Sequence, residues 1–268
     1  MEFHRNISND EKLVILFSGG LDSVIAYYYA LHFFDEKNVL GLFVDIGQPY
    51  ASFEKESVLT AKTLTNMNIQ LLDFPFIAHP NYLNNVPTPT NQVIPGRNMT
   101  LATIAANFGT TIWINALFGE LKEEMVDKNF KFFKEASEVL SYTFNYKIIV
   151  ESPFWNFTKT YIVSLAKQLG IHDDVLKATC SCYNPIYNKG IRYFCGDCLT
   201  CFKRKVSMVN NNIEENYVKD PFKSWYAKSV YDRRFEIEQK LITTYKNAYQ
   251  KVNLSFDDIP KYCTDSTI

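Results

Sequence analysis

The sequence predicts an α/β fold, a five-stranded, mostly parallel, doubly wound sheet with a helical extension at its C-terminal end. Short, unbroken apolar runs recur along the first 151 residues, as expected of strands that are buried on both faces. Segments with apolar residues at helical spacing lie between these runs. Because strands that alternate with helices form parallel sheets covered on both faces, the two patterns together indicate this fold class.

The elements follow one another in a regular order. The expected strands are residues 13–17, 39–44, 69–74, 111–117 and 147–151. The expected helices are residues 23–34, 51–66, 98–108, 127–142 and 158–169. The segment 75–95 is rich in Pro and Asn and breaks the alternation, because Pro87, Pro89 and Pro95 forbid a regular helix or central strand. Loops of that length often act as lids or binding loops.

Composition limits the class of protein. The chain has 268 residues, 47% of them hydrophobic, which excludes a disordered protein. Its 28 Lys and Arg against 29 Asp and Glu give a net charge of -1, which disfavours nucleic acid as the main partner. No run approaches the roughly 18 apolar residues of a membrane-spanning helix, and the N-terminus lacks the apolar core of a signal peptide. We therefore expect a cytoplasmic protein that does not bind membranes.

A glycine-rich loop directly follows the first expected strand. A helix N-terminus offers unpaired N–H groups, and glycines let the backbone approach a phosphate closely. An aspartate there would repel phosphate unless Mg²⁺ lies between them. The alternative interpretation is a tight turn capped by Asp22 or Ser23. The candidate ATP-binding residues are Phe17, Ser18, Gly19, Gly20, Leu21, Asp22 and Ser23.

Four cysteines near the C-terminal end of the α/β region have the spacing of a metal site. Cys182, Cys195, Cys198 and Cys201 form C-x₁₂-C-x₂-C-x₂-C. Four thiolates in a tetrahedral array suit a structural Zn²⁺; an iron–sulfur cluster and inert buried cysteines are the alternatives. Cys180 and Cys263 share no such spacing, so we interpret them as free thiols.

The loop and the cysteines together resemble a known family. The Ser-Gly-Gly-x-Asp-Ser string is similar to that of ATP pyrophosphatases with a modified phosphate loop, which have the adenine-nucleotide alpha hydrolase-like fold. With the cysteines, the chain resembles the 7-cyano-7-deazaguanine synthase family from about Lys12 to Lys205. Three further segments carry the resemblance: 44–48 (Val-Asp-Ile-Gly-Gln), 94–98 (Ile-Pro-Gly-Arg-Asn) and 152–159, which contains Ser-Pro-Phe and Thr-Lys.

The resemblance implies an ATP-dependent carbon–nitrogen ligase with Mg²⁺, ATP as co-substrate and structural Zn²⁺. Its substrates would be a carboxylated deazapurine and ammonia, joined as an amide that is then dehydrated to the nitrile. The implied catalytic residues are Asp22, Ser23 and Lys159, with Lys159 also binding ATP. The implied substrate-binding residues are Asp45, Gln48, Arg97, Asn98 and Asp127. An ordinary solvated Lys159, and helix capping or loop hydrogen bonding by Gln48, Arg97 and Asn98, are the alternative interpretations.

The resemblance divides the chain into an ATP pyrophosphatase domain (1–178), a zinc knuckle (179–205) and a helical C-terminal extension (206–268) with a helical stretch near 231–250. Two departures leave other functions open. Tyr50 stands where the family has His, and of its Tyr-Pro-Asp-x-Arg stretch only Asp127 remains. The alternatives are a ligase that joins a deazaguanine to an amine of a protein partner docked on 206–268, as in an antiviral defence operon, and a non-catalytic, zinc-containing interaction protein. A sulfur-transferring tRNA enzyme is disfavoured, and a homodimer is compatible with the resemblance.

Overall fold

The structure of the chain, a computed structural model, describes residues 4–48, 50–75, 94–120, 126–189 and 191–263. It divides into two compact units. The first comprises Met1–Phe157 and Asp174–Cys180, and the second comprises Thr158–Asp173 and Ser181–Ile268. The three-part division expected at residues 178 and 205 stays a prediction.

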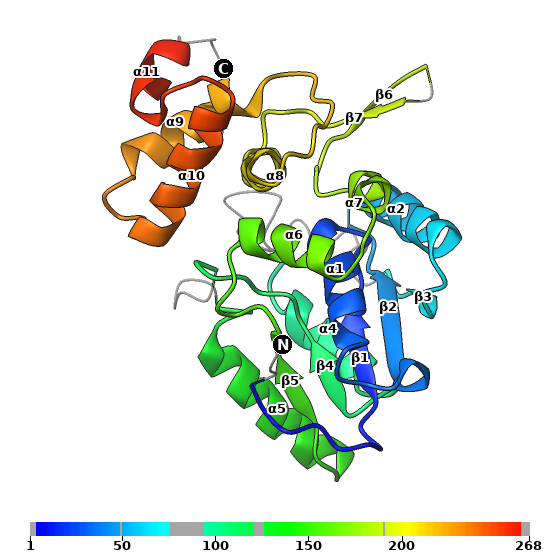
Figure 1. Cartoon of the computed structure of the whole chain (residues 1–268). Helices are drawn as coiled ribbons and strands as arrows, with labels where there is room; N and C mark the ends of the chain where they lie inside the picture. The colour runs from blue at the N-terminus through cyan, green and yellow to red at the C-terminus, as the bar shows by residue number, and fades with distance from the viewer. Residues whose placement is uncertain (1–3, 49, 76–93, 121–125, 190, 264–268) are drawn as a thin grey trace. The chain divides into compact units, whose positions relative to one another are not determined.

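The first unit is built on a parallel sheet. Its strands are β1 (Leu13–Leu16), β2 (Val39–Asp45), β3 (Ile69–Asp73), β4 (Thr111–Trp113) and β5 (Ile149–Glu151). They lie in the order β3-β2-β1-β4-β5, and every neighbouring pair is parallel (Figure 1). Leu13 of β1 pairs with Val39 on one side and with Thr111 on the other. This confirms the five-stranded parallel α/β fold expected from the apolar runs.

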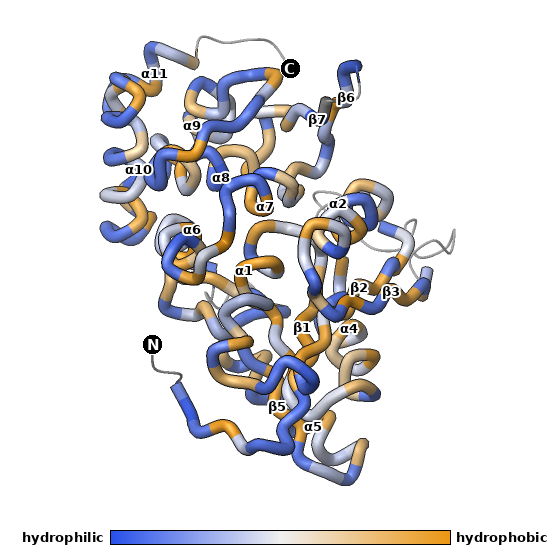
Figure 2. The backbone as a smooth tube through the Cα atoms, turned by 45° about the vertical axis from the view of Figure 1, so that its right-hand side comes forward, coloured by the Kyte–Doolittle hydropathy of each residue, from blue (hydrophilic) through white to orange (hydrophobic). Residues whose placement is uncertain are grey.

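Helices cover both faces of this sheet. They are α1 (Leu21–Ala30), α2 (Ala51–Leu64), α4 (Arg97–Ala105) and α5 (Phe130–Phe144). The same unit also contains most of α7 (Asp173–Ala178) and the short 3₁₀ turn η1 (Glu36–Asn38). Residues of α4 and α5 share one core cluster with Val14, Ile112 and Val150. Because crossovers between parallel strands are right-handed, α1 and α2 cover the opposite face. Leu13 and Ile15 have no exposed surface, and Figure 2 shows β1 coloured as hydrophobic.

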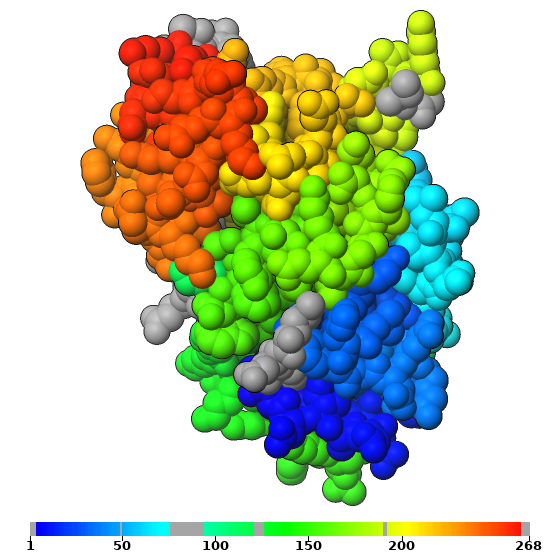
Figure 3. Space-filling view, viewed as in Figure 1, coloured from blue at the N-terminus to red at the C-terminus, as the bar shows by residue number. Residues whose placement is uncertain are grey.

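The second unit is mainly helical. It contains α6 (Lys159–Gln168), a hairpin of β6 (Ile186–Asn188) and β7 (Ile191–Tyr193), α8 (Leu199–Asn210), η3 (Pro221–Lys223), α9 (Trp225–Asp232), α10 (Gln239–Lys251), η4 (Phe256–Asp258) and α11 (Ile259–Tyr262). Its core clusters around Phe202, Phe222 and Tyr249, and the last two rings stack with centroids 4.3 Å apart. The helices from α9 onward form the tightly packed orange-to-red body in Figure 3. This confirms that the C-terminal part of the chain is helical, as the sequence predicts.

Some elements differ from the sequence-based expectation. The helical stretch expected near 231–250 is confirmed from Gln239 onward by α10, but its expected start is wrong, because α9 ends at Asp232 and α10 begins only at Gln239. The β6–β7 hairpin, α7 and α8 were not expected. The hairpin gave no signal because β6 is exposed along its whole length, so it lacks the apolar alternation of a half-buried strand. Most of the loop expected at 75–95 lies outside the described residues.

Among the described residues, no helix combines the length and the apolar character that crossing a membrane requires.

Candidate functional site

The glycine-rich loop joins β1 to α1 as the sequence predicts. Gly19 has φ +69°, and Gly20 is the N-cap of α1. The N–H of Gly20 donates to Ser18 Oγ at 3.3 Å, and Ser23 Oγ donates to the carbonyl of Gly20 at 2.9 Å. The loop is thus folded back on itself by short-range bonds. α1 begins directly after this loop without a side-chain cap on Gly20, and the N–H groups at the start of a helix are a general anion-binding arrangement.

A cavity of about 220 Å³ opens at the carboxyl ends of β1, β2 and β4. Ser18, Asp22 and Ser23 line it from the side of the glycine-rich loop. The chain runs outward from β1 through β2 to β3, and then returns to the other side of β1 for β4 and β5. Ligands of open α/β sheets bind at such a point of reversed strand order, outside the carboxyl ends of the strands. The cavity therefore lies where this fold class places its ligand site.

Hydrogen bonds fix the segment that follows β2. Asp45 Oδ1 accepts from the N–H of Gly47 at 2.9 Å. Gln48 is buried, and its Oε1 accepts from the N–H of Ile46 at 3.0 Å. Its Nε2 donates to Glu54 Oε2 at 2.7 Å. Gln48 lines the cavity together with Glu54, whereas Asp45 supports the turn beneath them.

The start of α4 supplies the cationic part of the cavity wall. Gly96, with φ +71°, is the N-cap of α4. Arg97 and Asn98 are the first two residues of the helix, and both line the cavity. Arg97 Nη1 donates to the hydroxyl of Tyr50 at 3.4 Å. Asn98 is buried, and its Nδ2 donates to the backbone carbonyl of Asp127 at 2.9 Å. Asp127 therefore contacts this site through its backbone carbonyl group.

The structure brings together most of the residues that the sequence singles out. Phe17, Ser18, Asp22, Ser23, Gln48, Arg97 and Asn98 line the same cavity. Lys159 begins α6, where Thr158 Oγ1 accepts from the N–H of Tyr161 at 3.2 Å. It belongs to the second unit, so its expected role at ATP stays a prediction. The roles expected of the other residues also stay predictions.

Two polar residues of the cavity wall, Glu54 and Asn115, were missed by the sequence analysis. Glu54 lies in the first turn of α2, and Asn115 follows β4. Asn115 Oδ1 is buried, and it has no hydrogen-bond partner within the described part of the chain. Asn115 gave no signal of its own, because it lies inside the run expected as a strand at 111–117. Glu54 gave none either, since one acidic residue in a helix is ordinary.

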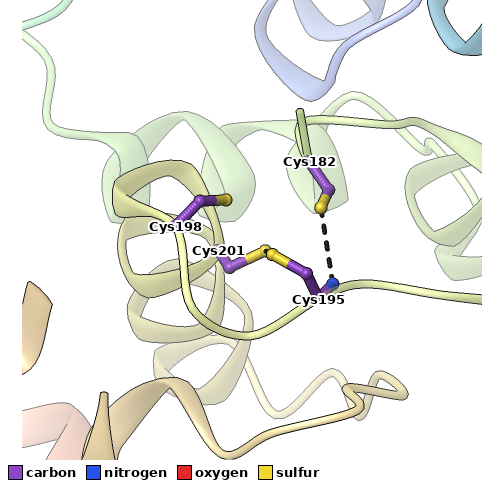
Figure 4. A group of neighbouring side chains, drawn as sticks. All are labelled: Cys182, Cys195, Cys198 and Cys201. Carbon is purple, nitrogen blue, oxygen red and sulfur yellow. Dashed lines mark hydrogen bonds between the residues drawn. The ribbon is translucent and has the colours of Figure 1, made fainter. Parts of the chain in front are cut away.

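The four cysteines of the expected metal site converge in the second unit. Their sulfur atoms all lie within 4.8 Å of one another, and those of Cys195 and Cys201 are 3.8 Å apart (Figure 4). A tetrahedral Zn²⁺ with bonds of about 2.3 Å to sulfur places its ligands about 3.8 Å apart. The cluster therefore fits Zn²⁺ in both ligand type and size.

Local structure explains how the cysteines meet. Cys198 is the N-cap of α8 and Cys201 lies in its first turn, while Cys195 follows β7. Cys182 comes from the loop after α7, and its sulfur accepts from the N–H groups of Asn184 and Cys195, each at 3.4 Å (Figure 4). Such N–H bonds favour the thiolate form that metal binding requires.

A buried ion pair supports the same region. Arg204 of α8 has no exposed surface, and its Nη2 lies 2.6 Å from Glu215 Oε1. Its Nη1 donates to Ser181 Oγ at 3.2 Å, and its guanidinium stacks 4.6 Å from the ring centre of Phe194. The hydroxyl of Tyr217 donates to Glu215 at 2.8 Å. Arg204 thus ties α8 to the segments that carry Cys182 and Cys195.

Comparison with known proteins identifies the family. The model of the family described as queuosine biosynthesis protein QueC matches residues 12–212, about three quarters of the chain. The chain belongs to this QueC family. The match confirms the resemblance drawn from the glycine loop and the cysteine spacing, and its limits agree with the expected span.

Curated relatives agree with this assignment. The chain is 28% identical to the 7-cyano-7-deazaguanine synthase of Methanococcus maripaludis over 222 residues, which cover 72% of this chain and 92% of the relative. It is 27% identical to the synthase of the same name from Methanocaldococcus jannaschii over 231 residues, covering 76% and 97%. The synthase from Clostridium novyi is 26% identical over 213 residues, covering 74% and 93%.

Among solved structures, the chain is similar to an NH₃-dependent NAD synthetase from Campylobacter jejuni, with a TM-score of 0.42 and 15% identity over 97% of this chain and 90% of that one. It is also similar to an NMN synthetase from Francisella tularensis, with a TM-score of 0.41 and 15% identity over 96% and 89%. A likeness this distant carries no conclusion about activity.

Proposed function

We propose that the chain activates the carboxylate of 7-carboxy-7-deazaguanine by adenylation and transfers the acyl group to ammonia, giving 7-cyano-7-deazaguanine by way of the amide. The observation that carries this proposal is the cavity at the carboxyl ends of β1, β2 and β4, where the phosphate loop lies with Gln48, Arg97 and Asn98. Membership of the QueC family supports the same class of ATP-dependent reaction.

The chemistry explains the residue types in the cavity. A carboxylate resists attack by an amine because it is anionic and its oxygen is a poor leaving group, whereas an acyl-adenylate releases AMP readily. The protein must therefore hold the triphosphate and the acid in line and stabilise the charge that develops between them. The N–H groups at the start of α1 and the hydroxyls of Ser18 and Ser23 would bind phosphate oxygens. The planar fork of Arg97 can bind the substrate carboxylate or a phosphate.

Two metal ions belong to the proposal. Asp22 would hold Mg²⁺, which, when bound, would neutralise phosphate charge. The four cysteines would hold Zn²⁺ in a closed site with no open position, so its role would be structural. The homodimer, the cytoplasmic location and the absence of nucleic-acid binding stay predictions.

The test is the reaction itself. The purified protein is incubated with 7-carboxy-7-deazaguanine, Mg-ATP and ammonium, and the deazapurine products and AMP are measured by mass spectrometry. We expect the amide and then the nitrile, together with AMP, only when ammonium is present. The Asp22→Ala, Ser23→Ala double variant should lose product, while Asp232→Ala, on the exposed part of α9, should not. ATP consumption without amide or nitrile would contradict the proposal.

A second candidate is the transfer of the deazaguanine acyl group to an amine on a partner protein. Two observations favour it. Tyr50, at the position where the family carries His, is bonded to Arg97 at the cavity. Residues beyond the family match form helices that share a buried core with Phe202 and Val206 of α8. Intact-mass analysis of proteins co-purified after the reaction would reveal such an adduct, and products restricted to the free amide and nitrile would exclude it.

A further inference from the structure

Glu54 presents its carboxyl group in the same cavity as the phosphate loop. Its Oε2 accepts from Gln48 Nε2 at 2.7 Å. The orientation of the Gln48 amide is fixed, since its Oε1 already accepts from the N–H of Ile46 at 3.0 Å. Because the Gln48 amide group cannot flip, its Nε2 always faces Glu54, and Oε2 of Glu54 accepts the hydrogen bond. None of the roles assigned so far uses this carboxyl group.

The surroundings of Glu54 favour proton exchange at neutral pH. Burial raises the pKa of Glu54 to about 7, and the negative charge of Asp45 acts in the same direction. The hydrogen bond from Gln48 and the positive charge of Arg97 oppose this rise. The nearby phenol of Tyr50 also has a raised pKa, chiefly because it is buried, and therefore stays neutral. A carboxyl group with a pKa near the working pH is suited to general acid–base catalysis.

The cavity also offers an acceptor that lacks a partner. Asn115 Oδ1, at the end of β4, is buried and has no partner among the described residues. A buried acceptor without a donor is destabilising, and a ligand that carries N–H groups would supply the missing donor. Ammonia carries such groups. The cavity thus combines one basic oxygen acceptor and one neutral oxygen acceptor beside the phosphate loop.

Building on the proposed ligase function, we propose that Glu54 is the general base that takes the proton from the amine nitrogen as it bonds to the activated carbonyl carbon. In this step the carbon–nitrogen bond forms and the bond from carbon to the adenylate oxygen breaks. AMP leaves with the electron pair of that bond. The proton lost by nitrogen passes to Glu54 and then to water, while Asn115 Oδ1 accepts a second N–H of the same nitrogen.

The experiment separates the two halves of the reaction. Acid-dependent exchange of pyrophosphate into ATP reports adenylation alone, and amide or hydroxamate formation reports nucleophilic attack. Glu54→Gln is compared with Glu56→Gln, because Glu56 lies on the same helix but is exposed. Hydroxylamine replaces ammonium in the pH series, because it is largely unprotonated near neutral pH and its own titration then adds little to the profile.

We expect Glu54→Gln to keep acid-dependent exchange and to lose product formation by about 100-fold or more, the usual effect of a general base. The wild-type rate of hydroxamate formation should rise with pH through about 7, because only the ionised carboxylate accepts a proton. This rise should disappear in Glu54→Gln and persist in Glu56→Gln.

Two results would overturn the role of Glu54. They are unchanged product formation in Glu54→Gln, and an equal loss of exchange and of product, which would indicate a role in binding or adenylation. A wild-type protein with no acid-dependent exchange would instead refute the ligase function, and the role of Glu54 would fall with it. Measuring exchange in every variant therefore tells the two failures apart.

Discussion

Gly19 shows how one residue determines the course of the phosphate loop. Its φ of +69° lies in the left-handed region, which side chains with a Cβ rarely adopt. A Cβ at this position would lie 2.7 Å from the backbone N of Val58 and 2.9 Å from the carbonyl carbon of Ser57. Both atoms belong to the backbone of α2, so neither can move aside cheaply. Gly19 is therefore required by conformation and by space.

A pair of glycine variants separates these two requirements. Gly170 has a similar φ of +73°, but a Cβ there would meet nothing within 4 Å. Gly170→Ala should cost about 1–2 kcal/mol of unfolding free energy from the left-handed conformation alone. Gly19→Ala should cost about 1–3 kcal/mol more, because overpacking is added. Chemical denaturation of both variants measures the difference, and equal losses would show that α2 tolerates the extra atom.

At the scale of elements, a charged network joins the N-terminal segment to the sheet. Arg5 donates to Glu11 before β1, to Glu151 of β5 and to Thr111 of β4. The guanidinium lies 3.0 Å from Glu151 Oε1, and the three charged side chains are no more than about one fifth exposed. Glu151 also accepts from the indole N–H of Trp113 at 3.1 Å. The N-terminal segment is thus held across β4 and β5 by ionic hydrogen bonds.

This network predicts a specific pH dependence of stability. Burial alone would raise the pKa of Glu11 and Glu151. Hydrogen bonds and positive charge outweigh it and lower both pKa values; for Glu11 they come chiefly from Arg5, and for Glu151 from His4 and Arg5. A carboxylate whose pKa is lower in the folded state stabilises the fold above its unfolded pKa, about 4.3, and loses this contribution as pH falls through the folded pKa. Thermal stability should therefore decline as pH falls below about 4.3.

Arg5→Met tests the assignment. We expect it to lower the unfolding free energy at neutral pH by about 2–3 kcal/mol, because hydrogen bonds between charged groups are lost. It should also make the decline in acid shallower, since Glu11 and Glu151 would lose the part of the lowering of their pKa values that Arg5 provides. Arg233→Met, at an exposed position after α9, is the matched control. If Arg5→Met lost stability in acid as steeply as the wild type, groups other than Glu11 and Glu151 would be responsible for that loss.

At the scale of the whole molecule, each unit has its own core. The first is centred on the sheet, with Val14 and Ile112 fully buried, and the second on Phe202, Phe222 and Tyr249. The cysteine cluster lies wholly in the second unit. Four thiolates packed this closely repel one another, so the bound cation is expected to be part of the stability of that unit.

Removal of the metal should therefore unfold the second unit and leave the sheet of the first unit folded. We expect one zinc ion per chain by elemental analysis, and a loss of hydrogen-exchange protection across residues 181–263 after treatment with a chelator. Protection of β1, β2 and β4 should be retained. Cys182→Ser should reproduce the effect, whereas Cys263→Ser should not, because Cys263 lies outside the cluster. Equal loss of protection in both units would refute this division of stability.

The parallel sheet, the glycine-rich loop after the first strand and the four cysteines that cluster were predictable from the sequence alone. Each of these is a local signal, because an apolar run, a glycine turn and a C-x₂-C spacing act over a few residues. Elements without such a local signal were not predicted. The exposed hairpin of β6 and β7 shows no apolar alternation, and the break between α9 and α10 contains neither proline nor glycine.

Which side chains share the cavity depends on the packing of segments that are far apart in the sequence. Glu54 and Asn115 are unremarkable where they stand in the sequence, and 60 residues lie between them. They reach one cavity because β1, β2 and β4 run parallel side by side, so the segments after their carboxyl ends meet at one edge of the sheet. Burial at that edge, which no short stretch of sequence encodes, is what raises the pKa of Glu54.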